Sequence, residues 1–186
     1  MSKPPKALSV DKDGNEDGYI PPIAYQRQVL NGGYTRLEIS APSDKLPIVH
    51  RKLVDRLSMP CKIRYVKLTD RATGEQLSKP ESFVAVEVSL VRLQQVLDVF
   101  SDLIYHDGRH QLWVLGLDKE QLILDELGVV YAYPDDFSFR EGLAELGWLD
   151  VKHESMANRD YVQVNFLATA DAQEKSLIQS LGMVRY

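Results

Sequence analysis

The stretch L-G-V-V-Y-A-Y-P-D-D, residues 127–136, decides the fold that we expect for this chain. Its centre is rich in valine and tyrosine, which favour strands, and Pro134 cannot extend a hydrogen-bonded strand. Asp135 and Asp136 follow as candidate caps for an amphipathic helix. The stretch therefore predicts a strand, a sharp exit and a helix, and we interpret this strand as the start of a second α/β unit.

The segment before this stretch predicts one complete unit. Strands are expected where apolar residues alternate, and helices where they recur every three or four positions. The predicted order is a strand at 34–40, a helix at 46–57, strands at 62–68 and 82–89, a helix at 93–104 and a strand at 111–115. This order is the split βαβ plan of ferredoxin-like domains, whose helices bury their apolar stripes against one face of an antiparallel sheet.

The segment after it can be interpreted in the same way. The predicted elements are a helix at 138–146, strands at 148–152 and 161–167, a helix after Thr169 and a strand at 183–186. Both helix exits, L-A-E-L-G-W-L and I-Q-S-L-G-M-V, place glycine before apolar strand residues. The recurrence suggests a tandem repeat of one fold.

We therefore expect an α+β fold of tandem ferredoxin-like (βαββαβ) units, with antiparallel sheets and helices packed on one face. The expected division is a flexible N-terminal tail at 1–33, a first unit at 34–116, a connector at 117–127 and a second unit at 128–186. Two alternatives stay open. Both halves can share a single continuous sheet, and the connector can be a short helix in place of the strand that we prefer.

Charge is distributed unevenly along the chain, whose net charge is −5. Residues 34–116 carry 12 basic and 10 acidic side chains, a net +2, whereas residues 117–186 carry 6 and 13, a net −7. Within the middle part, the basic side chains concentrate in one short segment, at Arg51, Lys52, Arg56, Lys62, Arg64, Lys67 and Arg71. A solvated face explains such a run. The more specific hypothesis is an anion patch, or a surface for the acidic part of a second copy, so a homo-oligomer is possible.

A polar cleft is the second candidate site. It would combine the histidines of H-D-G-R-H with the tyrosines and carboxylates of the central stretch: His106, Asp107, His110, Tyr131, Tyr133, Asp135 and Asp136. Paired carboxylates can share a proton or hold a cation. A structural interpretation competes, because Gly108 favours a turn between the histidines and Asp135 and Asp136 are placed to cap a helix.

The sequence argues against several classes of function. No G-x-S-x-G, P-loop, G-x-G-x-x-G or C-x-x-C motif occurs, so we expect no catalytic residue, metal or cofactor. The predicted sheet offers few aromatic residues on one face, at Tyr34 and Phe83, and they stand beside acidic residues, which argues against nucleic acid as a partner. No apolar run is long enough to cross a membrane. The single Cys61 and the polar N-terminus favour the cytoplasm.

We therefore expect a non-catalytic cytoplasmic module that binds or regulates a protein partner or a small ligand. The alternative is an enzyme that uses the polar His/Asp cleft, with or without the assistance of a metal. Fold class alone does not decide between them, because one fold supports many functions.

Overall fold

A nine-stranded sheet forms the centre of the protein, whose computed structural model describes residues 3–163 and 167–186. The strand order is β11-β5-β4-β6-β7-β8-β3-β2-β9, and all neighbours are antiparallel except β2 and β9. These strands are β2 (Ala24–Val29), β3 (Thr35–Ser40), β4 (Cys61–Thr69), β5 (Gln76–Val88), β6 (His110–Leu115), β7 (Gln121–Leu124), β8 (Val130–Tyr133), β9 (Leu149–Asp150) and β11 (Val184–Arg185). A separate two-stranded sheet pairs β1 (Leu8–Ser9) with β10 (Tyr161–Val162).

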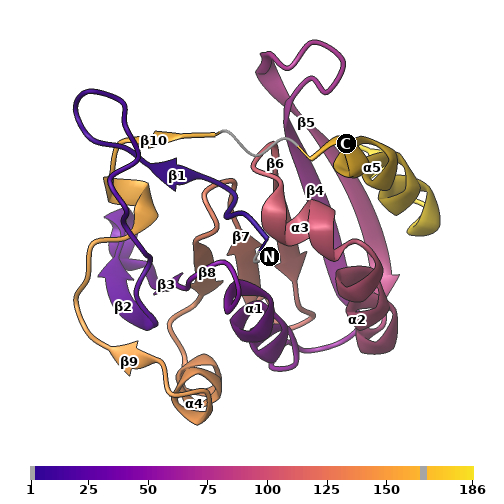
Figure 1. Cartoon of the computed structure of the whole chain (residues 1–186). Coiled ribbons are helices and arrows are strands. Elements are labelled where there is room, and N and C mark those ends of the chain that lie inside the picture. The colour runs from indigo at the N-terminus through magenta and orange to yellow at the C-terminus, as the bar shows by residue number, and fades with distance from the viewer. Residues whose placement is uncertain (1–2, 164–166) are drawn as a thin grey trace.

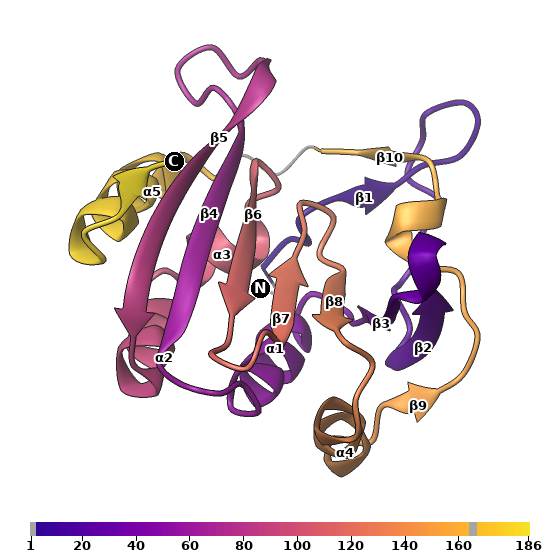
Figure 2. The same cartoon turned by 180° about the vertical axis from the view of Figure 1, so that it is seen from behind.

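Helices cover one face of the large sheet (Figure 1). They are α1 (Leu46–Val54), α2 (Leu90–Val99), α3 (Ser101–His106) and α5 (Ala168–Ser180), while α4 (Phe137–Glu145) contacts α1 at the lower end of the sheet. Two 3-10 turns, Asn31–Gly33 and Met156–Asn158, complete the described elements. Seen from behind, the strands β5, β4, β6 and β7 have no helix in front of them (Figure 2).

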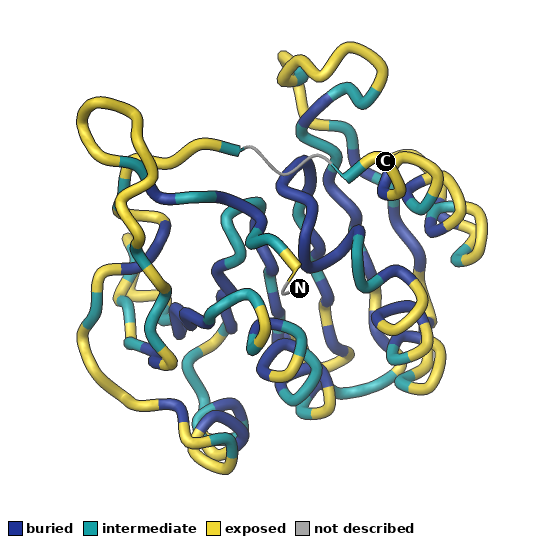
Figure 3. The backbone as a smooth tube through the Cα atoms, viewed as in Figure 1, coloured by how far each residue is buried: buried dark blue, intermediate teal, exposed yellow. Residues whose placement is uncertain are grey.

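The core lies between the helices and the covered face of the sheet. The buried stripe of α1, which includes Val49 and Leu53, packs in one cluster with inward residues of the central strands, such as Ile63 and Leu122. The tube coloured by burial shows buried residues along the central strands and on the inner sides of the helices (Figure 3). No helix in the described parts of the chain is both long enough and apolar enough to span a membrane.

The α+β class is confirmed, but two tandem ferredoxin-like units are not. Strands from both predicted halves alternate in one sheet, since β3 pairs with β8 through Leu37–Ala132 and Ile39–Val130. The stretch 127–136 supplies β8 and the start of α4 as expected, yet β8 forms a hairpin with β7 and does not begin a separate sheet. The single continuous sheet was the alternative left open.

Several segments differ from their expected roles. Residues 24–29, expected in a flexible tail, form β2 and pair with β3 along its whole length. Residues 121–124 form the strand β7, which confirms the preferred strand in the connector, but β7 is an inner strand of the sheet and not a link between two units. The expected helix at 93–104 is divided between α2 and α3 at Phe100, whose ψ of 26° leaves the helical range. The expected strand at 161–167 is described only as far as residue 163, and residues 164–166 lie outside the described parts.

Replacement of Leu122 by alanine tests the central position of β7. Leu122 is 0 % exposed, so we expect the free energy of unfolding to fall by about 2–5 kcal/mol, the usual cost of a leucine-sized core cavity. Urea denaturation measures the loss. Leu117→Ala is the matched control, because this leucine is 65 % exposed and its loss should change stability by less than about 0.5 kcal/mol. Equal losses in the two variants would contradict the placement of β7 in the core.

Candidate functional site

The uncovered face of β4, β6 and β7, called the open face here, is the first candidate site. Successive residues of a strand point to opposite faces, so β4 sends Ile63 and Tyr65 into the core and Lys62 and Arg64 outward. The ladder pairs then align outward residues across the sheet. One row runs Arg64–Trp113–Ile123–Tyr131, and its neighbour runs Lys62–Leu115–Gln121–Tyr133.

The guanidinium of Arg64 is held in a fixed position on this face. Its Nε and Nη2 donate hydrogen bonds to Ser82 Oγ at 3.1 and 2.9 Å. Its central carbon lies 5.0 Å from the ring centre of Trp113, within the range of a cation–π contact. The indole Nε1 of Trp113 donates to Gln111 Oε1 at 2.9 Å, so the ring is oriented as well. Arginine and tryptophan are thus ordered without any ligand.

Two adjoining hollows surround Lys62 on the open face. One, of about 220 Å³, is lined by Lys62, Arg64, Trp113, Leu115 and Gln121. The other, of about 270 Å³, shares Lys62 and Leu115 with the first and extends to Pro60, Cys61, Glu87, Gly116 and Leu117. The Lys62 ammonium lies 5.8 Å from the ring centre of Tyr186. The hollows therefore combine cations with apolar and aromatic surface.

Towards β8 the open face is closed by the protein itself. Tyr131 packs in a small cluster with Ala7, Val129 and Met156. Arg36 lies 4.0 Å over the Tyr131 ring and donates to the Tyr133 hydroxyl at 2.7 Å. The exposed part of the face is consequently the region around Lys62 and Trp113.

Five of the seven cations in the expected anion patch pair with carboxylates of the same chain. Arg51 pairs with Asp98, Lys52 with Glu145, Arg56 with Glu141 and Glu145, Lys67 with Glu174, and Arg71 with Asp107, Asp171 and Glu174. Lys62 and Arg64 have no carboxylate within 4.0 Å in the described parts of the chain. The structure therefore reduces the patch to two unpaired cations, and both lie on the open face.

The seven residues of the expected polar cleft are not brought together. The strands β6 and β8 are both antiparallel to β7 and therefore run in the same direction. His106, Asp107 and His110 precede or begin β6, whereas Asp135 and Asp136 follow the end of β8, so the two groups lie at opposite ends of the sheet. Tyr131 and Tyr133 lie between them on the outward side of β8.

Each charged or titratable member of that group already has a structural environment. His110 is fully buried and stacks on Tyr65 with ring centres 4.8 Å apart, and burial lowers its pKa well below the usual value. Burial also lowers the pKa of His106, whose Nδ1 lies 2.8 Å from the Pro4 carbonyl. Asp135 pairs with Arg27 and Arg140, and Asp136 caps α4 by accepting from the Phe139 amide at 3.0 Å.

Asp107 belongs to an ion-pair cluster that attaches α5 to the sheet. Arg71 reaches Asp107 and Glu174 at 3.3 and 2.5 Å, and Arg109 reaches Asp107 at 2.6 Å. Burial raises the pKa of Asp107, but the hydrogen bond from Arg109 and the charge of Arg71 outweigh it, so the pKa lies below its ordinary value. In the parts of the chain that are described, no three His, Cys, Asp or Glu side chains converge as a metal site would require.

Some residues that matter in the structure had no signal in the sequence. The sequence predicted a strand that includes Trp113 but not the face of the sheet to which its side chain points. Only the pairing of β6 with β4 places Trp113 beside Arg64. Lys6 was assigned to a tail, yet it is 1 % exposed. Burial of a lysine from an irregular segment leaves no periodic pattern that would reveal it.

Replacement of Arg71 by alanine tests whether this cation has a structural role. We expect a loss of about 3–5 kcal/mol at neutral pH, because Asp107 and Glu174 would remain buried without this partner. Asp107 has a lowered pKa in the folded state, so its stabilising contribution is present above its unfolded pKa of 3.8 and is lost as the pH falls through the folded value. The deficit of Arg71→Ala should therefore shrink on acidification below pH 3.8.

Urea denaturation at several pH values measures this deficit. Arg185→Ala is the control, because its pair with Glu81 is exposed at the surface and should contribute less than about 1 kcal/mol. A deficit of Arg71→Ala that is no larger than that of the control, at every pH, would contradict a structural role.

Comparison with known proteins does not assign the chain to a family. The chain matches no protein-family model, no curated protein and no solved structure.

Proposed function

We propose that the protein is a non-catalytic cytoplasmic binding module that takes an acidic segment of a protein partner on its open face. The observation that carries the proposal is the contrast between paired and unpaired cations. Five cations of the basic segment are neutralised within the chain, and Lys62 and Arg64 on the uncovered sheet face are not. An acidic segment would supply the carboxylates that these two cations lack.

The chemistry of the surface supports a protein segment as the ligand. Arginine and tryptophan are enriched among the residues that dominate protein–protein binding energy. Arg64 is already fixed by Ser82 and Trp113, so little side-chain entropy remains to be lost when it binds a carboxylate. Apolar area lies on both sides of the cations of β4: Leu115 on β6 and the exposed Val86 on β5. A segment that carries both acidic and apolar side chains fits this combination.

The burial and the partners of the candidate acid–base side chains support a binding role over a catalytic one. A general acid or base has to reach its substrate within hydrogen-bond distance. His50 and His110 are buried, and burial raises the pKa of the Cys61 thiol to about 11. Asp135 is held by two arginines and Asp136 by the helix that it caps. The hollows around Lys62 contain none of the candidate cleft residues.

The cytoplasmic part of the proposal rests on the single cysteine. Cys61 is buried and unpaired, which fits a reducing compartment. The excess negative charge of residues 117–186 is partly neutralised within the chain, because carboxylates of this part form ion pairs with cations of the basic middle part. If two copies of the chain associate through charge, Lys62 and Arg64 are therefore the cations of this segment that remain to bind an acidic group of the second copy.

Titration with a short peptide of alternating glutamate and leucine tests the proposal. We expect saturable binding by isothermal titration calorimetry, weakened by added salt because the contacts are partly exposed ion pairs. The double variant Lys62→Ala/Arg64→Ala should bind about tenfold more weakly, since two such pairs together contribute roughly 1.4 kcal/mol.

Two controls make the result specific. Lys79→Ala/Lys175→Ala removes the same charge from exposed positions away from the open face and should leave the affinity unchanged. A lysine–leucine peptide of the same length should not bind. Equal weakening in the two double variants would show that only net charge matters, and the open face would then lose its role.

A further inference from the structure

Glu87 lines the same hollow as Lys62 at the border of the open face. This hollow has a volume of about 270 Å³, and Leu115 and Leu117 supply apolar parts of its lining. Glu87 is exposed, and in the described parts of the chain its carboxylate forms no ion pair with any cation, Lys62 included. The surface that we propose for an acidic segment therefore carries an unpaired anion next to its two unpaired cations.

A β-bulge determines where Glu87 stands. The ladder of β4 and β5 shifts register beside Lys62, where two residues of β5, Val86 and Glu87, oppose this single residue of β4. Bulges change the direction of side chains and are frequent next to functional sites. The bulge therefore places Glu87 directly across from one of the two unpaired cations.

The backbone of Glu87 adopts a conformation that glutamate rarely takes. Its φ is 56°, in the left-handed region. Glycine takes this conformation without strain, and asparagine takes it more readily than glutamate does. The bulge precedes α2, and a change of chain direction explains a bulge but not the choice of a glutamate. Strained residues concentrate at binding and catalytic sites, so the carboxylate of Glu87 calls for a functional explanation.

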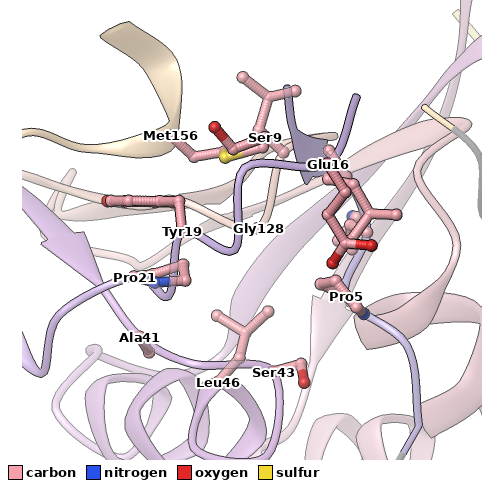
Figure 4. Close-up of a pocket in the computed structure, with 14 residues that line it drawn as sticks. Pro5, Ser9, Glu16, Tyr19, Pro21, Ala41, Ser43, Leu46, Gly128 and Met156 are labelled. Carbon is pink, nitrogen blue, oxygen red and sulfur yellow. The ribbon is translucent and has the colours of Figure 1, made fainter. Parts of the chain in front are cut away.

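The cavity beneath the N-terminal segment does not offer a comparable site. Its volume is about 40 Å³, which is room for only a few water molecules, and Pro5, Leu46 and Gly128 are among the residues that line it (Figure 4). A ligand that carries charges of both signs and an apolar part therefore fits the hollow beside Lys62 and not this cavity.

We propose that Glu87 selects the partner segment by its charge pattern. The segment carries acidic side chains that bind Lys62 and Arg64, and one basic side chain that binds Glu87. This inference rests on the proposed function of the open face. A uniformly acidic segment would place a carboxylate beside Glu87, and like charges that meet at an interface weaken binding. A lysine or arginine at that position replaces the repulsion by an ion pair.

Calorimetric titration with a set of peptides of equal length tests the selection. The parent peptide alternates glutamate and leucine, and in its derivatives the first or the last glutamate is replaced by lysine or by glutamine. At one of the two ends, the lysine peptide should bind about threefold more tightly than the glutamine peptide, as expected for an exposed ion pair. In Glu87→Gln this preference should disappear. The parent peptide should bind Glu87→Gln about threefold more tightly than it binds the unaltered protein.

Two further variants separate the position of the charge from its sign and from backbone strain. Glu75→Gln removes an exposed carboxylate from the loop at the other end of the β4–β5 hairpin, and it should keep the preference for lysine. Glu87→Gly should lose the preference and should melt at or above Glu87→Gln, because glycine suits the left-handed backbone. A lower melting temperature for Glu87→Gly would contradict the conformation on which the argument depends.

The results distinguish this inference from the proposed function. If the parent peptide does not bind the unaltered protein, the proposed function fails and the selection by Glu87 fails with it. If all peptides bind the unaltered protein equally, or if Glu87→Gln keeps the preference for lysine, the open face retains its role and only the selection by Glu87 is overturned. Loss of the preference in Glu75→Gln as well would show an effect of net charge and would also overturn it.

Discussion

The protein depends on burial of one face of a nine-stranded sheet beneath α1, α2, α3 and α5. Apolar burial provides the driving force, and the alternation of side chains along each strand decides what remains outside. Once Ile63 and Tyr65 enter the core, Lys62 and Arg64 must point away from it. The open face is thus a consequence of how the core forms, and the candidate site needs no special loop.

Charge pairing within the chain then determines which parts of the surface remain attractive. The basic segment of α1, β4 and the following loop lies against acidic groups of α4 and α5, and pairs such as Arg56–Glu141 and Arg71–Glu174 neutralise most of it. The two cations left over lie together on the side of the sheet that no helix covers. A long run of basic residues in the sequence therefore corresponds to a short exposed cationic surface in space.

Individual strands and helices could be predicted from the sequence, but the order in which the strands pair in the sheet could not. Alternation along residues 62–68 predicted β4, and the Asp136 cap predicted the start of α4. The pairing of β3 with β8 joins segments about a hundred residues apart, and no periodic signal encodes such a contact. The two glycine-terminated helices suggested a repeat, but this pattern carries no information on topology. Helix C-termini commonly end in a left-handed glycine whatever fold surrounds them.

The candidate sites were predictable to different degrees for the same reason. Lys62 and Arg64 were part of the expected anion patch, but only tertiary structure separates them from the five paired cations. His110 was expected in a cleft and instead stacks on Tyr65 in the core. The burial of Lys6 had no sequence signal, since its ammonium donates to the backbone carbonyls of Ile104 and His110, about a hundred residues away in the sequence.

Quenching of tryptophan fluorescence by iodide and by caesium tests the central claim most directly. Trp148 is only 6 % exposed, so both quenchers should report mainly on Trp113 beside Lys62 and Arg64. If the open face is uncovered and positively charged, iodide should quench much more efficiently than caesium, and the difference should vanish at high ionic strength. Equal quenching by the two ions, or none by either, would contradict an uncovered cationic face.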